Sequence, residues 1–412
     1  MKIAVIGAGI IGITSAHELA AAGHAVTVFE KSAAAAEGAS FAPSGLMAPS
    51  LLHPMALGAH MPGQWNRLLK NARLLSLRRG LRIADLQWLW QWSHVADPAS
   101  VPAAIQSLRA LYTYSLDRMR AIASHASLEF EQSTGQLAVL RTPADEAALR
   151  PVLTLLKESG IVFKELSRED AMKVEPALSL STDFHAGIYF PNDEVANCRQ
   201  FAMLLKNELL HKKVDFQFNA HVTQIRTTPD LSLYIEGEAH SRSFDHIVVC
   251  TGAATNSLLQ PLQSDFSQAN VCSYSLTLPI REATLAPRSA VLDIQSHITL
   301  HRLGQRIRLC GGAELGGNLL RKDTRTINKL YQMLEQFFPG AALHTAGSQV
   351  FKSNFNMSST GLPRVGASRI SGVWINAGHG VHGWGTACGS AKLIADLIAK
   401  KEPEISAQAF QG

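Results

Sequence analysis

Near its N-terminus the chain reads Lys2-Ile3-Ala4-Val5-Ile6-Gly7-Ala8-Gly9-Ile10-Ile11-Gly12. A short apolar strand runs into three glycines with the spacing G-x-G-x-x-G, and an apolar-periodic helix, Ile13 to Ala22, follows them. A second strand, Ala25 to Phe29, completes a βαβ unit of about thirty residues and ends at Glu30. This context predicts a dinucleotide-binding fold rather than a chance glycine turn.

The residues of this turn have separate physical roles. Gly7 permits the tight turn, Gly9 lets the backbone approach a pyrophosphate, and Gly12 lets helix and strand pack closely. The helix N-terminus offers free N–H groups to the phosphates. Glu30 lies where a carboxylate accepts hydrogen bonds from an adenosine ribose, which argues against NADP and leaves FAD and NAD open. The expected contacts here are Gly7, Ala8, Gly9, Ile10, Ile11, Gly12, Glu30 and Lys31.

The composition indicates a globular enzyme that is long enough for two domains. The chain has 412 residues, of which 46% are hydrophobic and 17% charged, with a formal net charge of +5. No Lys/Arg run with interleaved aromatic residues points to nucleic acid, and no apolar stretch is long enough to span a membrane. The five cysteines form no C-x-x-C pair, so we expect no metal site and a reducing, cytoplasmic compartment.

Two features leave contact with a membrane surface open. The basic stretch between Arg67 and Arg82 is best interpreted as a solvated helix face, with lipid headgroups as the alternative. Trp88, Trp90 and Trp92 alternate along a helical pattern and do not share one narrow face. We expect them to be buried between helices, and an apolar patch that docks a membrane or a partner is the alternative.

The middle of the chain predicts a second sheet. A buried strand, Phe244 to Cys250, runs into the small-residue turn Thr251-Gly252 and suggests a parallel strand returning to the nucleotide sheet. Consecutive strands between Cys272 and Gly312 predict a largely antiparallel sheet inserted between nucleotide-binding segments, whereas Pro191 to Glu194 is expected to be a turn. The fold class is therefore α/β, a Rossmann-like domain with an inserted α+β substrate domain. The expected boundaries are 1–85, 192–262 and 352–412 for the nucleotide domain, and 86–191 and 263–351 for the substrate domain.

A second glycine turn stands near the C-terminus. The strand Gly372 to Ala377 is followed by Gly378-His379-Gly380-Val381-His382-Gly383-Trp384-Gly385 and by a helix from Thr386 to Ala399. A nicotinamide enzyme has no evident need for this unit. A reduced flavin carries negative charge at its N1–C2=O edge, and a helix N-terminus directed there stabilises it. The turn therefore favours FAD.

Several stretches together resemble the FAD-dependent D-amino-acid oxidase superfamily, most closely its bacterial D-amino acid dehydrogenases. They are Ser40–Gly45, Gln87–Gln91, Gly135–Leu137 with Arg141-Thr142, Pro191–Glu194, Tyr274–Ile280, Arg306–Arg308, Ala377–Trp384 and Ala387–Ser390. The resemblance implies non-covalent FAD and the oxidation of an amine to an imine, which water hydrolyses. It adds these expected cofactor contacts: Ser40, Ser44, Gly45, Leu46, Val222, Thr251, Gly252, Gly378, His379, Gly380, Gly383, Trp384, Gly385 and Thr386.

The chain also departs from this family's pattern. A Gly-x-Arg-Pro motif usually precedes the equivalent of Gly361-Leu362-Pro363, and its arginine grips the substrate carboxylate; here Phe355 stands at the arginine position. Cys272-Ser273 replaces an expected Lys-Gly. The predicted substrate contacts are Phe355 and His53, and the predicted catalytic residues are Tyr274, His382 and Arg308. The candidates for a substitute carboxylate ligand are Arg308, Arg302, His382 and His53.

The expected function is oxidative deamination of a D-amino acid or related amine by hydride transfer to flavin N5. Because the carboxylate arginine is missing, an N-substituted amine, such as an opine or a glycine derivative, is the alternative substrate. The sequence also leaves open a flavin-binding subunit without its own turnover and, less favourably, a plain NAD dehydrogenase. The expected electron acceptor is a quinone or another acceptor, with attachment to the inner face of the cytoplasmic membrane left open. The sequence does not predict the oligomeric state.

Overall fold

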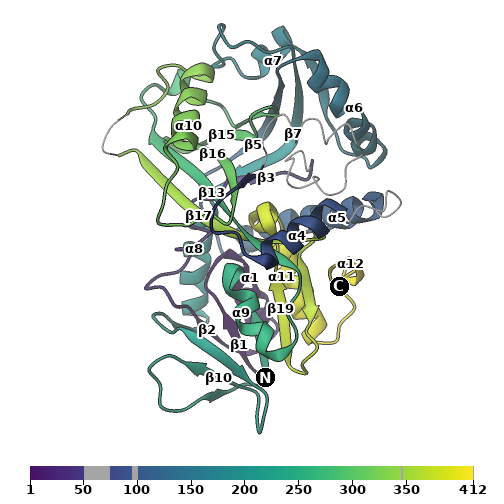
Figure 1. Cartoon of the computed structure of the whole chain (residues 1–412), viewed down its shortest axis with the longest axis vertical. Coiled ribbons are helices and arrows are strands. Elements are labelled where there is room, and N and C mark those ends of the chain that lie inside the picture. The colour runs from purple at the N-terminus through teal and green to yellow at the C-terminus, as the bar shows by residue number, and fades with distance from the viewer. Residues whose placement is uncertain (51–74, 95–100, 345–346, 412) are drawn as a thin grey trace.

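A computed structural model describes residues 1–50, 75–94, 101–344 and 347–411. It contains two large sheets, one in each half of the molecule (Figure 1). The chain alternates between the two halves, and both termini lie in the half that holds β1 and β2 (Figure 1). Among the described residues, no helix is both long and apolar enough to cross a membrane.

The first sheet has six strands and is parallel except at one edge. Parallel pairing of Ile3–Ile6 with His246–Val249 confirms that the strand predicted before Thr251 returns beside the first one. The strands in spatial order are β18 (Arg364–Ala367), β19 (Val373–Ala377), β12 (His246–Val249), β1 (Lys2–Ile6), β2 (Ala25–Phe29) and β8 (Asp215–Gln217). Only β18 runs antiparallel to its neighbour.

Helices cover one face of this sheet and a small sheet covers the other. On the first face, apolar side chains pack among α1 (Ile10–Ala21), α5 (Val101–His125), α8 (Cys198–His211) and α11 (Gly383–Ile398). On the second face, they pack against α9 (Thr255–Leu259) and the three-stranded sheet of β9 (Val222–Arg226), β10 (Ser232–Ile235) and β11 (Arg242–Ser243). The sheet is therefore buried on both faces, as its apolar strands require.

The second sheet is larger and mostly antiparallel, as the sequence predicts. Its spatial order is β17 (Gln349–Ser358), β13 (Gln268–Pro279), β16 (Arg306–Leu315), β15 (Ile298–Leu303), β14 (Ala290–Asp293), β5 (Gln132–Leu140), β7 (Ala186–Ala196) and β3 (Leu46–Met47). Two short strands attach to it, β4 (Ser76–Leu77) and β6 (Lys164–Ser167). Its helices are α4 (Ile83–His94), α6 (Pro143–Glu158), α7 (Arg168–Val174) and α10 (Thr324–Phe337), and α12 (Gln408–Gln411) ends the described chain.

One local prediction was wrong. Pro191 to Glu194, expected to be a turn, lies within β7. The register explains this result: Phe190 pairs with Gln136 and Glu194 with Thr134, so the strand bulges between them. A bulge accommodates a proline, which has no N–H to give to a ladder, without ending the strand.

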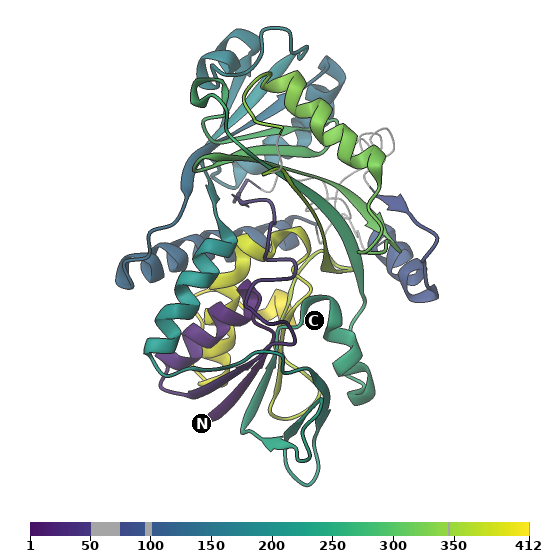
Figure 2. The same cartoon turned by 90° about the vertical axis from the view of Figure 1, so that its left-hand side faces the viewer.

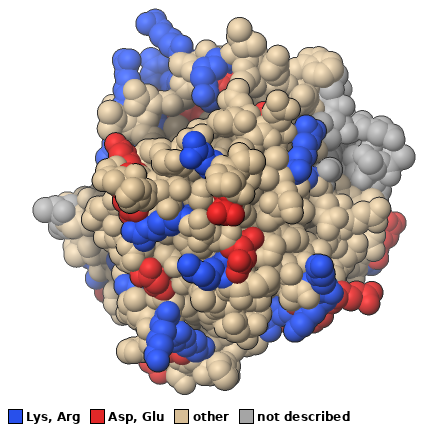
Figure 3. Space-filling view, turned by 90° about the horizontal axis from the view of Figure 1, so that it is seen from below, with Lys and Arg blue, Asp and Glu red and all other residues tan. Residues whose placement is uncertain are grey.

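The three tryptophans of α4 differ in burial. Trp88 and Trp92 are buried, with their ring centroids 5.6 Å apart, but they pack against β13, β16 and β17 and not between helices as expected. Trp90 is exposed, which the sequence allowed only as the alternative. Seen from below, the surface carries basic and acidic side chains interspersed with one another (Figure 3).

Candidate functional site

A cleft of about 1500 Å³ lies between the two sheets. One wall is formed by the glycine turns that follow β1, β12 and β19, where the strands end at their carboxyl edge. The other wall is formed by β13, β16 and β17 of the larger sheet. Ligands of open α/β sheets bind at this edge, so the fold alone marks the cleft as the candidate site.

The first glycine turn is shaped for close backbone approach. Gly7 has φ +104°, and a Cβ there would lie 2.6 Å from the carbonyl oxygen of Cys250. A Cβ on Gly12 would lie only 1.8 Å from the carbonyl oxygen of Gly7. A side chain therefore fits at neither position. Because both residues are glycines, β1, α1 and β12 can lie close together at the cleft.

Polar groups at the start of α1 suit an adenosine diphosphate. The Ile10 N–H donates to Ser40 Oγ at 3.0 Å, and Gly9, Ile10 and Ile11 line the cleft. Glu30 accepts hydrogen bonds from the N–H groups of Ala8 (2.8 Å) and Ser32 (2.9 Å). These bonds fix the carboxylate at the end of β2 and leave lone pairs for a ribose. The residues present therefore fit the nucleotide half of FAD.

The C-terminal turn presents a helix N-terminus to the same cleft. α11 begins at Gly383, and Gly378 to Trp384 line the cleft. His379 is held by Thr386 Oγ1 and Asn376 Oδ1, both at 2.9 Å, and burial lowers its pKa to about 3. His382 Nδ1 and the Tyr112 hydroxyl are 2.9 Å apart. The turn is thus held by side-chain hydrogen bonds, and the positive end of the α11 dipole faces the cleft.

Most of the predicted cofactor contacts meet in this one cleft. Those that line it are Gly7, Gly9, Ile10, Ile11, Glu30, Lys31, Ser40, Ser44, Leu46, Thr251, Gly252, Gly378, His379, Gly380, Gly383 and Trp384. Ala8, Gly12, Gly45, Gly385 and Thr386 are not among the residues that line it. Val222 lies in β9 and packs in the apolar cluster on the far face of the first sheet. Its contact with the cofactor stays a prediction.

Phe355 lies in the opposite wall of the cleft. It is half-buried and packs in the apolar cluster that holds Trp88, Val271 and Leu315. Its cross-strand partner is Val271 on β13. The position where the family pattern has a carboxylate-binding arginine thus places an aromatic ring in the cleft wall. Its contact with the substrate stays a prediction. The other predicted substrate contact, His53, lies outside the described residues.

The two remaining catalytic candidates have their polar atoms engaged elsewhere. Arg308 is buried, and it donates to Thr277 Oγ1 (3.0 Å) and to the carbonyl oxygen of Pro43 (3.3 Å). Burial lowers the pKa of this guanidinium. Tyr274 lines the cleft, but its hydroxyl donates to Glu314 at 3.0 Å and accepts from the Asp323 N–H at 2.8 Å. Their catalytic roles therefore stay predictions.

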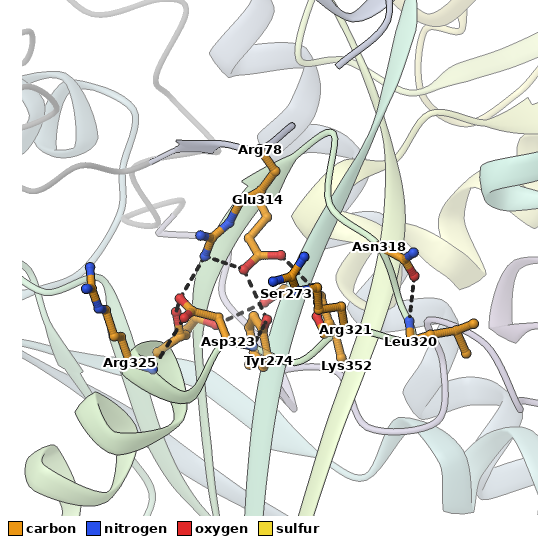
Figure 4. Close-up of polar contacts among 12 residues, drawn as sticks. Arg78, Ser273, Tyr274, Glu314, Asn318, Leu320, Arg321, Asp323, Arg325 and Lys352 are labelled. Carbon is orange, nitrogen blue, oxygen red and sulfur yellow. Dashed lines mark hydrogen bonds and ion pairs between the residues drawn. The ribbon is translucent and has the colours of Figure 1, made fainter. Parts of the chain in front are cut away.

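Glu314 is the centre of a buried charge cluster beside the cleft (Figure 4). Its carboxylate accepts from Arg78 and from Lys352 Nζ, each at 2.6 Å. Lys352 also donates to the carbonyl oxygen of Arg321. Although burial favours the neutral amine, Glu314 and Tyr274 hold the pKa of Lys352 above its ordinary value. The cluster ties β4, β13, β16 and β17 to the loop that precedes α10.

The sequence did not single out two cleft residues with unpartnered amide atoms. Asn270 and Asn356 are cross-strand partners on β13 and β17, and both line the cleft. Both amide atoms of buried Asn356 and the Oδ1 of Asn270 have no partner among the described residues. Asn356 stands where the Gly-x-Arg-Pro pattern has its proline. This departure was the signal in the sequence that could have pointed to Asn356. The pairing of the two residues depends on register, which the sequence does not reveal.

A family model described as FAD dependent oxidoreductase matches residues 2–397. The chain belongs to this family. Its cofactor is FAD, and the cleft residues described above fit this group. A D-amino acid dehydrogenase of Bradyrhizobium diazoefficiens is 30% identical over the whole of this chain and 98% of its own length.

Solved structures show the same fold at low sequence identity. Glycine oxidase from Geobacillus kaustophilus matches with a TM-score of 0.74 and 18% identity, covering 99% of this chain and 98% of its own. Iminodiacetate oxidase from Chelativorans sp. BNC1 matches with a TM-score of 0.73 and 17% identity over the same shares. The family match and the D-amino acid dehydrogenase relative indicate an FAD-dependent oxidoreductase that acts on amino acids or amines, with the exact substrate open, and these solved structures show the fold.

Proposed function

We propose that this flavoenzyme oxidises a D-amino acid or a related amine with a bulky or N-substituted apolar portion. The observation that carries the proposal is Phe355, half-buried in the cleft wall where an arginine would grip a small amino acid. The Bradyrhizobium relative named a D-amino acid dehydrogenase supports the D-amino acid class. Iminodiacetate oxidase has the same fold. This supports only that the fold is compatible with an N-substituted amine as substrate.

The chain's own residues position the reactants and exclude water. When bound, FAD supplies a hydride acceptor at N5. The N-terminus of α11 faces the cleft and would stabilise negative charge on a bound flavin. His379, which is neutral and hydrogen-bonded at both ring nitrogens, would add no proton there. Phe355 would offer an apolar surface to the substrate, beside the cleft-lining amides of Asn270 and Asn356. We assign no residue as a general base, because the substrate amine needs only to be neutral when it binds.

The test is flavin bleaching under anaerobic conditions. The purified holoprotein is mixed with D-amino acids, L-amino acids, secondary amines and opines, and loss of the oxidised flavin absorbance is followed. We expect rapid bleaching by bulky D-amino acids or N-substituted amines and slow bleaching by D-alanine. D-Alanine as the best substrate would contradict the proposal.

Phe355→Arg restores the residue of the family pattern and sharpens this test. A charge-assisted contact to a carboxylate is worth about 1.5–3 kcal/mol, so we expect preference to shift towards small D-amino acids by about tenfold or more. Phe355→Leu is the matched control, because it removes the ring without adding charge. If Phe355→Arg leaves the substrate ranking unchanged, Phe355 does not contact the substrate.

A flavin-binding subunit without turnover is the second candidate, because the expected carboxylate arginine is missing. Such a protein would retain FAD and would not be bleached by any amine in the screen, so bleaching by one substrate excludes it. We further propose that electrons leave to a quinone or a similar acceptor. Reoxidation by a soluble quinone at least about tenfold faster than by air-saturated oxygen would support that assignment, and equal rates would refute it.

A further inference from the structure

A tyrosine and a histidine from distant parts of the chain meet in the wall of the cleft. Tyr112 lies on α5 and His382 directly precedes α11, and both residues line the cleft. The Tyr112 hydroxyl oxygen and His382 Nδ1 are 2.9 Å apart, and the two rings are nearly perpendicular with centroids 5.5 Å apart. Because both residues are buried, this hydrogen bond is shielded from water.

A glycine makes room for this pair. A Cβ on Gly385 would lie 2.0 Å from Cε1 of Tyr112, so a side chain there would displace the tyrosine ring. Figure 2 shows α5, in blue, beside the yellow α11 where the two halves of the molecule meet, and apolar side chains of both helices pack in one cluster. The contact of Tyr112 with the turn before α11 is therefore fixed by the packing of the two helices.

The hydrogen bond has one direction that satisfies both groups. Among the described residues, His382 Nδ1 is the one hydrogen-bond partner of the Tyr112 hydroxyl. Burial and the nearby Asp193 carboxyl raise the pKa of Tyr112, so the hydroxyl keeps its proton. A buried O–H needs an acceptor, and Nδ1 accepts only when it carries no proton. A protonated Nδ1 would leave the Tyr112 proton without an acceptor among the described residues.

This direction determines the tautomer of His382. When Nδ1 is unprotonated, the imidazole is neutral and its proton is on Nε2, which makes that nitrogen a hydrogen-bond donor. His379 lies on the same turn and differs, because its two ring nitrogens bond to Thr386 and Asn376. The donor at Nε2 of His382 is thus set by the bond that Tyr112 makes to the other nitrogen.

His382 lies beside the positive end of a helix dipole. It is the N-cap residue of α11, and the residues from Gly378 to Trp384 line the cleft that fits FAD. A reduced flavin carries negative charge at its N1–C2=O edge, which the first N–H groups of a helix stabilise. The turn belongs to the cleft wall that the glycine turns form, opposite the wall that carries Phe355. We therefore assign the Nε2 donor to the flavin and not to the substrate.

We propose that Tyr112 is a positioning residue, whose hydroxyl holds His382 as an Nε2–H donor that stabilises the reduced flavin together with the N-terminus of α11. His382 is the residue that would contact the cofactor, and Tyr112 acts through it. A donor whose tautomer is already fixed needs no reorganisation when negative charge forms, which is the condition for effective electrostatic stabilisation. The pair therefore raises the reduction potential of the flavin.

The test is the reduction potential of the bound flavin, measured against reference dyes under anaerobic conditions and without substrate. Tyr112→Phe removes the hydroxyl and allows the imidazole to take its other tautomer. We expect this variant to weaken the preference for reduced over oxidised flavin by about threefold to tenfold, a fall of about 14–30 mV for a two-electron couple. His382→Leu removes the donor itself and should lower the potential by at least as much.

A double variant distinguishes positioning from a direct effect of Tyr112. In the His382→Leu background, Tyr112→Phe should change the potential no further, and an additive fall would overturn the assignment. Nitrogen NMR of protein with isotopically labelled histidine gives a second readout, whether or not a variant retains FAD. The His382 signals, identified by their absence from His382→Leu, should show an unprotonated Nδ1 that changes in Tyr112→Phe. A protonated Nδ1 in the unchanged protein would overturn the proposal.

Tyr114→Phe is the matched control, because it removes a hydroxyl from the same helix. Tyr114 bonds to Glu404 at 3.3 Å and is not among the residues that line the cleft, so its variant should keep the potential of the unchanged protein. Equal falls in the two tyrosine variants would overturn the proposal.

An unchanged potential in Tyr112→Phe would also overturn it. If that variant instead raises KM for the amine, His382 serves the substrate and not the flavin. The proposal rests on bound FAD and does not depend on which amine the enzyme oxidises. Because the potential is measured without substrate, failure here is distinct from failure of the proposed function.

Discussion

At the residue scale, Gly12 is the position with the least room for change. A Cβ there would lie 1.8 Å from the Gly7 carbonyl oxygen, which is backbone and cannot move aside cheaply. We expect Gly12→Ala to abolish FAD binding or folding, measured by flavin content and thermal melting. Gly9→Ala is the comparison: its Cβ would meet only Ser40 Oγ, at 3.3 Å, so the variant should fold, whatever the added methyl does to FAD binding. Equal behaviour of the two variants would contradict this account.

Asp193 gives a pH-dependent stability that one substitution removes. Burial raises the pKa of this carboxyl from 3.8 to about 7, despite two hydrogen bonds from Ser50. Between these two values the folded protein therefore holds a proton that the unfolded chain has already lost. Stability should fall as pH rises from about 4 to about 7, on the order of 1.4 kcal/mol per pKa unit at most.

Asp193→Asn tests this assignment, because the amide stays neutral at every pH. Urea unfolding at pH 5 and pH 8 should show a larger stability advantage of the variant over the unchanged protein at pH 8 than at pH 5. Glu175, whose pKa burial also raises to about 7, titrates in both proteins and cancels in the comparison. A difference that is the same at both pH values would contradict the assignment.

At the element scale, the charge cluster around Glu314 joins strands that the sequence does not show to be neighbours. Glu314→Gln would leave Arg78 and Lys352 without a shared counter-charge, so we expect it to destabilise the fold by about 3–5 kcal/mol. Adding Lys352→Met should recover part of that loss, because it removes one of the two cations that shared the lost charge. Denaturant unfolding of the two singles and the double measures the coupling.

An exposed ion pair serves as the control against which this loss of stability is compared. Glu146→Gln breaks the exposed pairs with Arg150 on α6 and with His185, and should cost no more than about 1 kcal/mol. If Glu314→Gln is no more costly than this control, or if the double variant is simply additive, the cluster does not act as a unit.

The sequence predicted local units well and long-range pairing poorly, for a physical reason. Both strand–glycine turn–helix units could be identified because helix and strand periods and glycine conformations are local properties. That Phe355 lines the cleft was expected from its place in a motif. Asn270 beside Asn356, and Lys352 beside Glu314, depend instead on strand register, which forms only when distant segments pair. The strand through Pro191 was missed because turn residues also suit a bulge.

At the scale of the whole molecule, the cleft takes its walls from both large sheets, so FAD should couple their stabilities. The glycine turns of the first sheet and strands β13, β16 and β17 of the second face the same cavity. A ligand that binds only the folded protein adds about 1.4 kcal/mol for each tenfold excess over its dissociation constant.

We therefore expect the apoprotein to melt at a lower temperature than the holoprotein, with the midpoint rising steadily as free FAD is added. Calorimetry across a hundredfold range of FAD measures the effect. Riboflavin, which lacks the adenosine diphosphate that we expect Glu30 and α1 to hold, is the matched ligand. Riboflavin should stabilise the protein far less. Because residues of both sheets line the cleft in which we expect FAD to bind, both should unfold in one transition when FAD is bound. Two separate transitions in the holoprotein would show that the sheets do not share the cofactor's binding energy.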